Sequence, residues 1–376
     1  MSELPLAGIR VLDATAYIAG PFGATVLADL GAEVIKVETP SGDPARSMTP
    51  LDGDRSAYFH IVNRNKKAIT LDLKSAEGQM ELQTLLDGVD VFLNNFLPQQ
   101  LKSMELLPGQ LMLNRPRLII GNLSSYGSEG PSATWPGYDA TVQARTGIMH
   151  VTGEASGQPV RTGVSILDIG SGTWLALGIL AAIVKRERTG LGSLVETSLF
   201  ESGALWVSYH LAANELTHNA SVRSGSGHPA FSPYGIFQTQ QGTLCIGVGN
   251  NSTFTKLCEL LERRDLITDP RFINNVDRVA NAIELKSLIE SALSRKSAIE
   301  WASELANGGV PADRVQLPEN LFDDDQARAM KIMVEYPDSM TSITALPGLP
   351  LRFDGVRPPI RIPAPHFSAV PDPKIS

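Results

Sequence analysis

An aspartate beside two glycines is the residue best placed for chemistry in this sequence. It lies in the segment Arg161-Thr-Gly-Val-Ser-Ile-Leu-Asp168-Ile-Gly-Ser-Gly172, which runs into the apolar stretch Thr173 to Val184. Because glycines let backbone amides and a ligand approach closely, we predict a small-residue turn before a buried helix. Two roles are open to Asp168: a reacting carboxylate, or a cap of that helix's N-terminus.

Other residues with chemical potential favour structural roles. Asp323 to Asp325 are consecutive, so their carboxylates point in different directions and suit a helix N-terminus better than a metal ion. The loop Ala19-Gly-Pro-Phe-Gly-Ala lacks the glycine spacing of dinucleotide-binding loops and a Walker lysine. Cys245 and Cys258 form neither a disulfide framework nor a zinc spacing. We predict no metal site, no permanently bound cofactor and a reducing, cytoplasmic location.

The elements that must position these residues begin with an alternation of strands and helices. Ile9 to Asp13 reads as a buried strand, Pro21 to Leu30 as a helix ended by Gly31, and Val34 to Glu38 as a second strand. This alternation predicts an α/β domain with a parallel sheet. Further short strands are predicted at Ala68 to Leu73, Asp90 to Leu93 and Leu118 to Leu123.

The pattern changes after a segment rich in glycine and serine, residues 221 to 229, which we predict to be a mobile loop or link. Tyr234 to Thr239 and Thr243 to Val248 then predict a hairpin. Helical spacing follows at Thr253 to Glu262, Ala282 to Leu293 and Ala298 to Ala306. We predict a large domain beginning with residues 1–215, a small α+β domain with its linkers at 216–325, and a C-terminal segment at 326–376.

Composition narrows the class of protein. The chain has 376 residues, of which 43% are hydrophobic, and carries a formal net charge of −8. This size is enough for a large core, whereas nucleic-acid binding requires clustered basic charge. No secretory leader is recognisable, and the apolar run from Leu175 to Val184 falls short of a membrane span. We therefore expect a soluble protein that binds neither nucleic acid nor a membrane.

Taken in order, short segments along nearly the whole chain resemble the class III coenzyme A transferases. This CaiB/BaiF-type family includes formyl-CoA, carnitine and dicarboxylate CoA-transferases and α-methylacyl-CoA racemases. Each segment is weak by itself, but their order and spacing are specific. The resembling segments are Pro5 to Asp13, Ala19 to Pro21, Leu30 to Glu38, Gly42 to Pro44 with Arg46, Asn65 to Lys74, Asn95-Phe96, Gly137 to Asp139, Val164 to Gly172, His228-Pro229, Pro233 to Gly235 and Gly309 to Ala312.

The resemblance implies a fold, an assembly and a reaction. The fold is a Rossmann-like large domain, completed by the returning C-terminus, with a smaller domain, in a homodimer of interlocked ring-like subunits. The aspartate matching Asp168 would attack an acyl-CoA thioester and form an aspartyl anhydride and then an aspartyl-CoA thioester. CoA would thus pass from a donor such as succinyl-CoA to a short carboxylic or dicarboxylic acid. Amide donors for the oxyanion are expected from Gly170 to Gly172 or from Ser224 to Gly227.

The resemblance also implies positions that bind CoA, a substrate in this chemistry. Ile18 and Ala19 would flank the pantetheine arm, and Tyr138 would be a positioning group near Asp168. Without the resemblance, the favoured interpretation is a solvated lysine for Lys74 and a core aromatic for Phe96. The positions expected around the nucleotide are Leu71, Asp72, Leu73, Lys74, Asn95 and Phe96, with Lys102 as a further candidate because family arginines are replaced by Thr39 and Leu97.

Departures from the family pattern refine the expected substrate. Tyr138 stands where racemases carry a histidine base, which disfavours racemisation because a phenol is a poor base near neutral pH. Ile18 stands where formyl-CoA transferases carry glutamine, which disfavours formyl and oxalate substrates. The tail from Pro363 to Ser368 also departs from the usual ending.

The segment from His228 to Gly235 resembles that of transferases for small dicarboxylates. His228 and Arg223, with Gly225 and Gly227 beside them, are candidates for receiving a distal carboxylate. A packing role for His228 is equally open. Two alternatives to CoA transfer remain: an acyl-CoA racemase or isomerase of the same fold, and a non-catalytic acyl-CoA-binding protein.

Overall fold

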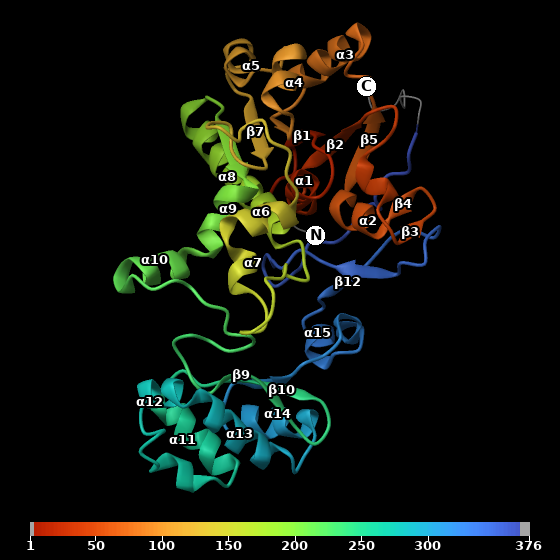
Figure 1. Cartoon of the computed structure of the whole chain (residues 1–376). Coiled ribbons are helices and arrows are strands. Elements are labelled where there is room, and N and C mark those ends of the chain that lie inside the picture. Colours follow the sequence, from red (N-terminus) through yellow and green to blue (C-terminus); the bar gives the residue numbers. More distant parts are fainter. Residues whose placement is uncertain (1–3, 369–376) are drawn as a thin grey trace. The chain divides into compact units, whose positions relative to one another are not determined.

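The computed structural model describes residues 4–368 of the chain, and it divides into two compact units (Figure 1). The large unit comprises Met1–Ile148, Arg161–Glu215 and Asp325–Ser376. The small unit comprises Met149–Val160 and Leu216–Asp324. Two helices, α7 (Ile148–Val151) and α10 (Ser208–Thr217), cross the boundaries between the units.

The large unit is built on a six-stranded parallel sheet, as the alternation of strands and helices predicts. The strand order is β5-β2-β1-β6-β7-β8. This is the order of a doubly wound Rossmann sheet, in which strands are added first on one side of the first strand and then on the other. Sequence analysis missed only the edge strand β8. The strands are β1 (Arg10–Ala14), β2 (Glu33–Glu38), β5 (Lys66–Thr70), β6 (Val91–Asn94), β7 (Ile119–Ser124) and β8 (Leu194–Ser198).

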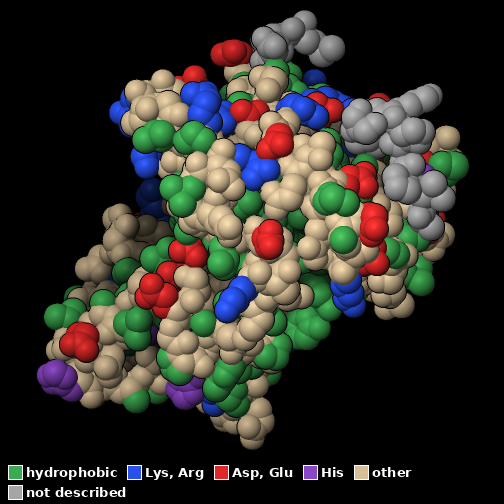
Figure 2. All heavy atoms as spheres, turned by 90° about the horizontal axis from the view of Figure 1, so that it is seen from above, with side chains coloured by type: hydrophobic (Ala, Val, Ile, Leu, Met, Phe, Trp, Pro, Cys, Tyr) green, Lys and Arg blue, Asp and Glu red, His purple; other side chains and the backbone are tan. Residues whose placement is uncertain are grey.

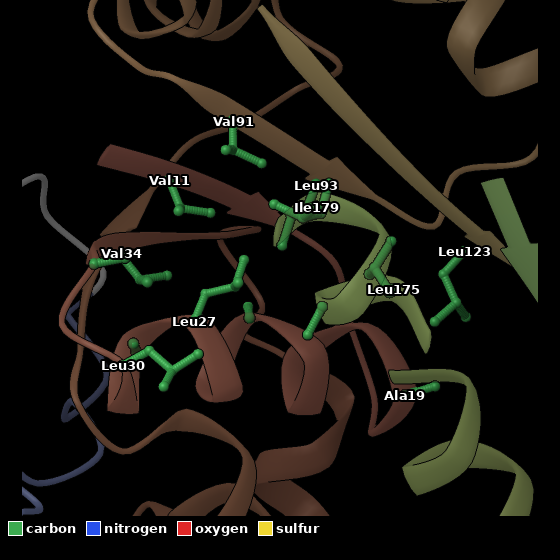
Figure 3. Packing of buried hydrophobic residues seen from close by; sticks show 14 of the residues in the cluster. Val11, Ala19, Leu27, Leu30, Val34, Val91, Leu93, Leu123, Leu175 and Ile179 are labelled. Atoms are coloured by element: carbon green, nitrogen blue, oxygen red, sulfur yellow. The ribbon is translucent and has the colours of Figure 1, made fainter. Parts of the chain in front are cut away.

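Helices cover both faces of this sheet because its apolar residues alternate in direction. Val11, Val34 and Val91 belong to the core formed with α1 and α8 (Figure 3). Their neighbours Leu12 and Ile35 belong to a second core formed with α3, α4 and α5 on the opposite face. The helices named here are α1 (Ala19–Asp29), α3 (Ala76–Asp87), α4 (Pro98–Ser103), α5 (Pro108–Asn114) and α8 (Ile166–Thr189).

Helices α1 and α8 approach so closely that glycine is required at their crossing. A Cβ atom added to Gly172 would lie 2.5 Å from the carbonyl oxygen of Ala19, and one added to Gly23 would lie 2.8 Å from the carbonyl oxygen of Gly172. Such distances are shorter than any packed side chain tolerates. Gly172 therefore serves helix packing, whereas sequence analysis assigned it to a turn that opens onto a ligand.

Helix α8 begins earlier and is longer than the apolar run predicted. It spans 24 residues, so Asp168, Gly170 and Gly172 lie inside it, and the predicted turn before the helix is wrong. Within residues 4–368 it is the one helix long and apolar enough to cross a membrane by length and composition. Its residues Leu175 and Ile179 are fully buried in the core of the large unit.

The remaining elements of the large unit are short. Strands β3 (Leu51–Asp52) and β4 (Arg55–Ser56) form a hairpin, which is followed by helix α2 (Ala57–Asn63). Two further helices, α6 and α9, flank α8. The other elements are α6 (Asp139–Thr146), α9 (Leu199–Trp206), α15 (Asp325–Ala329), β12 (Met333–Glu335) and β13 (Ala345–Pro347).

The C-terminal segment packs against the first third of the chain. The hydroxyl of Tyr336 lies 2.8 Å from Nδ1 of His60, and the two Arg361-Ile362 amides donate to Oδ1 of Asn65. The guanidinium of Arg55 bonds to the carboxylate of Asp338 at 2.6 Å. These long-range contacts make residues 325–368 part of the large unit's fold. Residues 369–376 lie outside the described part.

The small unit has its own core around a three-stranded antiparallel sheet. Strands β9 (Tyr234–Gln238) and β10 (Thr243–Gly247) form the predicted hairpin, and β11 (Ala312–Arg314) pairs with β10. Trp301 is buried in this core and donates its indole N–H to the Leu293 carbonyl at 2.8 Å. Its helices are α11 (Asn251–Leu260), α12 (Asn275–Ala280), α13 (Ala282–Leu293) and α14 (Ala298–Asn307).

Candidate active site

A cavity of about 670 Å³ opens beside β1, where the order of strands in the large unit's sheet reverses. From β1 the chain continues to β2 on one side, and it returns to β6 on the other side of β1. Ligands bind at such a switch point because the loops leaving the two strands separate there. The cavity is lined by residues that follow β1, β6, β7 and β8, and by Tyr138 and Asp168.

Asp168 reaches this cavity from the first turn of α8. Its own backbone N–H and that of Leu167 donate to Oδ2 of Asp139, at 3.3 and 2.7 Å. Asp139 thus occupies the capping role that sequence analysis left open for Asp168. No hydrogen bond or ion pair to the Asp168 carboxylate is formed by the residues that the structure describes, so this carboxylate is available to a ligand.

The environment of Asp168 makes its carboxyl group unusually basic. Burial raises its pKa to about 7, and the negative charge of Asp139 acts in the same direction. The positive charge of Arg161 opposes both effects. A carboxyl group that gains a proton near neutral pH, beside a cavity, is a feature of catalytic sites.

A buried amide holds the start of α8 against α6. Gln143 donates from Nε2 to Oδ1 of Asp139 at 2.5 Å and to the hydroxyl of Thr162 at 3.1 Å. Its Oε1 accepts from the Thr162 backbone N–H at 3.0 Å. Because Asp139 also binds the first amides of α8, this network fixes where the Asp168 side chain starts. Sequence analysis identified Asp139 only as a family mark and missed Gln143.

The loop after β1 forms the opposite wall and is braced through its backbone. Asn95 accepts from the Ala16 N–H at 3.2 Å and donates to the Ala16 carbonyl at 3.0 Å. Asp43 accepts from the Tyr17 N–H at 3.2 Å. The Asn95 side chain, predicted to contact the nucleotide, is therefore engaged with the protein backbone although it lines the cavity.

Two buried lysines form ion pairs beside this loop. Lys36 pairs with Asp43 at 2.7 Å, and Lys66 pairs with Asp13 at 2.8 Å. Burial disfavours both charges of the second pair and lowers the pKa of Lys66 to about 8, while the two lysines hold the pKa of Asp13 below its usual value. Lys36 also donates to the Thr15 carbonyl at 3.0 Å.

The structure brings together only some of the predicted CoA-binding residues. Ala19 and Phe96 line the cavity together with Asn95, Tyr138 and Asp168. Ile18 is buried at the start of α1 and does not line it. Lys102 is exposed in α4, next to Leu101, which does line it.

The predicted segment from Leu71 to Lys74 lies away from the cavity. It leaves β5, which is separated from β6 by β2 and β1. Leu71 is buried and Leu73 packs against the same core, so their side chains have a structural role. Asp72 accepts from the Lys74 N–H at 3.0 Å, and the exposed Lys74 side chain points out of the core.

The candidates for binding a carboxylate lie in the small unit. His228, Gly225 and Gly227 line a separate cavity of about 310 Å³, in which the His228 ring stacks with Phe231 at 4.9 Å between centroids. Arg223 donates to three backbone carbonyls, those of His150, Glu154 and Gly157. The hypothesis that Arg223 receives a substrate carboxylate is therefore not supported, because its guanidinium is engaged in holding residues 150–157.

Several cavity residues were missed by sequence analysis. The segments from Ser124 to Glu129 and from Trp135 to Gly137 form much of the wall, and Glu196 and Glu201 contribute from β8 and α9. For Ser124 to Glu129 the signal available in the sequence was their position directly after the predicted strand Leu118 to Leu123, since ligands gather at the carboxyl ends of parallel strands.

Charged side chains of both signs lie interspersed on the face of the protein that Figure 2 draws. Among residues 4–368 no group of three or more His, Cys, Asp or Glu side chains could hold a metal ion.

Comparisons with known proteins agree with this geometry. The sequence pattern of CoA-transferase family III matches residues 6–369. The chain is 36% identical over 357 residues to acetyl-CoA:oxalate CoA-transferase of Acetobacter aceti, covering 94% of this chain and 90% of that protein. It is 34% identical over 352 residues to succinyl-CoA:glutarate CoA-transferase of Homo sapiens, covering 93% and 80%.

A crystal structure of a CAIB/BAIF family protein from Brucella suis superposes with a TM-score of 0.86 at 32% identity, covering 97% of both chains. The family match spans nearly the whole sequence, and the relatives that it agrees with are named for CoA transfer. The chain therefore belongs to CoA-transferase family III and is a CoA-transferring enzyme.

Proposed function

We propose that this enzyme moves CoA from an acyl-CoA, such as succinyl-CoA, to a short carboxylic or dicarboxylic acid, with Asp168 as the nucleophile. The observation that carries the proposal is the Asp168 carboxylate itself. It lines the cavity at the sheet's switch point and has no bonding partner among the described residues. A nucleophile must be available in this way, whereas a structural carboxylate would be paired.

The proposed reaction is a series of balanced acyl exchanges. An Asp168 oxygen attacks the thioester carbonyl, the carbon–sulfur bond breaks, and CoA thiolate leaves a mixed anhydride. The thiolate attacks the aspartyl carbonyl, releases the donor carboxylate and forms an aspartyl-CoA thioester. The acceptor carboxylate attacks this thioester and expels CoA thiolate. The thiolate then attacks the acyl carbon of the acceptor and regenerates the Asp168 carboxylate.

The raised pKa of Asp168 suits this reaction. A carboxylate with a pKa of about 7 is a stronger nucleophile than an ordinary aspartate, yet about half of it is ionised at neutral pH. The nearby charge of Asp139 favours converting the carboxylate to a neutral ester-like intermediate. Positioning of the Asp168 side chain by α8 accelerates the attack further, because weak nucleophiles depend on alignment.

The acceptor is proposed to be a small dicarboxylate. The relatives from Acetobacter aceti and Homo sapiens are named for oxalate and glutarate, both dicarboxylic acids. Ile18 disfavours oxalate, but the relative named for oxalate is 36% identical to this chain, so oxalate belongs among the acids to be tested. His228 remains a candidate for the distal carboxylate.

We also propose a homodimer. Helix α10 has no buried residue, and its side chains Tyr209 and Leu211 are 50% and 56% exposed. Trp206, immediately before it, is 47% exposed. Apolar side chains gathered in this way usually mark an interface. Light scattering after size-exclusion chromatography should give twice the 40.4 kDa chain mass, and a monomer would contradict the proposal.

Asp168→Asn tests the proposed function. With succinyl-CoA as donor and a panel of short acids as acceptors, we expect CoA transfer to fall by about 10³-fold or more, because no covalent intermediate can form. Intact-mass measurement of the parental enzyme should detect a CoA adduct that is absent from the variant. Transfer at the parental rate in a folded Asp168→Asn enzyme would refute the assignment.

Deuterium exchange and intact-mass measurement separate the alternatives. A racemase would exchange the α-proton of an acyl-CoA with deuterium from the solvent and would need no acceptor acid. Membership of CoA-transferase family III is against a non-catalytic acyl-CoA-binding protein, which would bind CoA and form no adduct. Racemisation is disfavoured by Tyr138, which lines the cavity and stands where the resembling racemases carry a histidine base, because a phenol is a poor base near neutral pH.

A further inference from the structure

Tyr17 has a backbone conformation that tyrosine rarely adopts. Its φ angle is +70°, in the left-handed region where Cβ crowds the following carbonyl oxygen. The side chain is 41% exposed and lines the cavity, so burial of the ring does not account for this conformation. Strained residues of this kind persist where the surrounding structure fixes them, and they gather at functional sites.

The surrounding structure fixes Tyr17 through buried polar groups. Its N–H donates to Asp43, which pairs with the fully buried Lys36. On the preceding residue, Asn95 binds both the N–H and the carbonyl of Ala16. Lys36 holds the Thr15 carbonyl as well. The loop from Thr15 to Tyr17 is therefore held by side chains from three other segments, and Tyr17 cannot relax without breaking these bonds.

The ring that this loop presents meets Tyr138. The two ring centroids are 5.7 Å apart with planes at 74°, an edge-to-face contact. A hydrogen bond with Tyr138 raises the pKa of Tyr17, so this phenol stays neutral at physiological pH. Tyr138 directly precedes Asp139, the residue that binds the first amides of α8. The two rings and Asp168 line one cavity.

We propose that Tyr17 is a specificity-determining residue, whose ring forms with Tyr138 a rigid wall that limits the bulk of the acyl group reaching Asp168. The substrate class that fits is a short acyl chain. The inference rests on the proposed role of Asp168, but it concerns which thioesters react and not how they react. A flexible residue would let a bulkier chain displace the wall, whereas the braced backbone resists such movement.

The test compares two substitutions that separate the ring from its hydroxyl. The kcat/KM values are measured for a series of straight-chain CoA esters from acetyl-CoA to octanoyl-CoA with one acceptor acid. Tyr17→Ala removes the wall, and the ratio of octanoyl to acetyl activity should rise about tenfold or more. Tyr17→Phe keeps the ring and should leave the ratio near the parental value. Tyr58→Ala, an exposed tyrosine of α2 outside the cavity, is the matched control.

An unchanged ratio in folded Tyr17→Ala would overturn the inference, even if both activities fell together, because a purely structural residue lowers all substrates equally. Should Tyr17→Ala not fold, Tyr138→Ala removes the other half of the wall and must shift the ratio in the same direction. Failure of the Asp168 assignment is distinguishable, because transfer by Asp168→Asn tests it with acetyl-CoA alone. A shifted ratio in Tyr17→Ala would still support the wall.

Discussion

Two glycine-containing segments were expected to supply amide donors for the oxyanion, and they differ in structure, one being helical and the other a loop. Gly170 and Gly172 lie inside helix α8, where Gly172 contacts the backbone of α1 and the amides follow the helical pattern. Gly225 and Gly227 lie in a loop of the small unit, where Gly225 has a φ angle of +60° and both are exposed. Glycine near an active site can thus make a helix rigid or let a loop turn, and the sequence alone does not separate these roles.

Substitution at the helix crossing should give the largest effect on stability. Gly172→Ala places a methyl group against the Ala19 carbonyl, so we expect the free energy of unfolding to fall by about 2–3 kcal/mol. Urea unfolding followed by circular dichroism measures it. Gly109→Ala in α5, where a Cβ meets nothing within 4 Å, is the control and should be neutral or slightly stabilising. Equal losses in both variants would refute the proposed contact.

Activity should depend on pH through Asp168, which lies in helix α8. The proposed attack requires an ionised Asp168, whose pKa is raised to about 7, so kcat/KM should fall about tenfold per pH unit below 7. Arg161→Gln removes a charge that lowers this pKa, so the midpoint should move to higher pH. Arg188→Gln, at the far end of α8, is the control and should leave the midpoint unchanged.

The same pKa predicts how stability changes with pH. The folded state prefers protonated Asp168, so its contribution is present below pH 3.8 and is lost as pH rises through about 7. Asp168→Asn stays neutral at every pH and should therefore stabilise the protein more at pH 8 than at pH 4. Thermal unfolding at both pH values checks the sign, and a larger gain at pH 4 would contradict the raised pKa.

Substitution in the loop from Ser224 to Gly227 should change the partitioning between hydrolysis and transfer more than it changes stability. Gly227 has no positive φ angle, and an added Cβ would lie 3.0 Å from the Ser224 carbonyl oxygen and 3.6 Å from that of Tyr234, so Gly227→Ala should cost about 1 kcal/mol or less. If the loop from Ser224 to Gly227 supplies oxyanion donors and excludes water, hydrolysis of the acyl-CoA should rise relative to transfer. Unchanged partitioning between the two reactions would count against that role.

Relief of strain at Tyr17 should change stability by a similarly small amount, but in the favourable direction. Tyr17→Gly places glycine at a φ angle of +70°, and we expect a gain of about 1 kcal/mol in the free energy of unfolding. Thermal unfolding at pH 7 measures it. Tyr58→Gly, in helix α2, should instead lose about 1 kcal/mol. A loss at Tyr17 would mean that contacts of the ring outweigh the strain.

Much of the fold could be predicted because it is written in local patterns. Five of the six parallel strands and the hairpin of the small unit follow from runs of buried residues and their turns. Strand β8 was missed because Leu194 to Ser198 carries polar residues at the sheet edge, where only one neighbour covers it. The start of α8 was misplaced because glycines suggested a turn, although packing against α1 decides their conformation.

The candidate site was predictable only where residue type and position suffice. Asp168 and Tyr138 were found, and both line the cavity. The roles of Asn95 and Arg223 could not be foreseen, since their partners are backbone carbonyls and amides brought close by tertiary structure. The buried pair of Lys36 and Asp43 was also invisible, because neither residue type is usually found inside a protein.

The glycine crossing of α1 and α8 has a mechanical consequence. Ala19, on the wall of the cavity, and Gly172, one turn beyond Asp168, touch through their main chains with no side chain between them. Side chains can swing between rotamers, whereas backbones in direct contact transmit any displacement at once. The expected pantetheine-binding segment and the helix that carries Asp168 therefore move together. Their separation is set by van der Waals contact between the two backbones, which can hold it within about the half ångström that alignment for reaction demands.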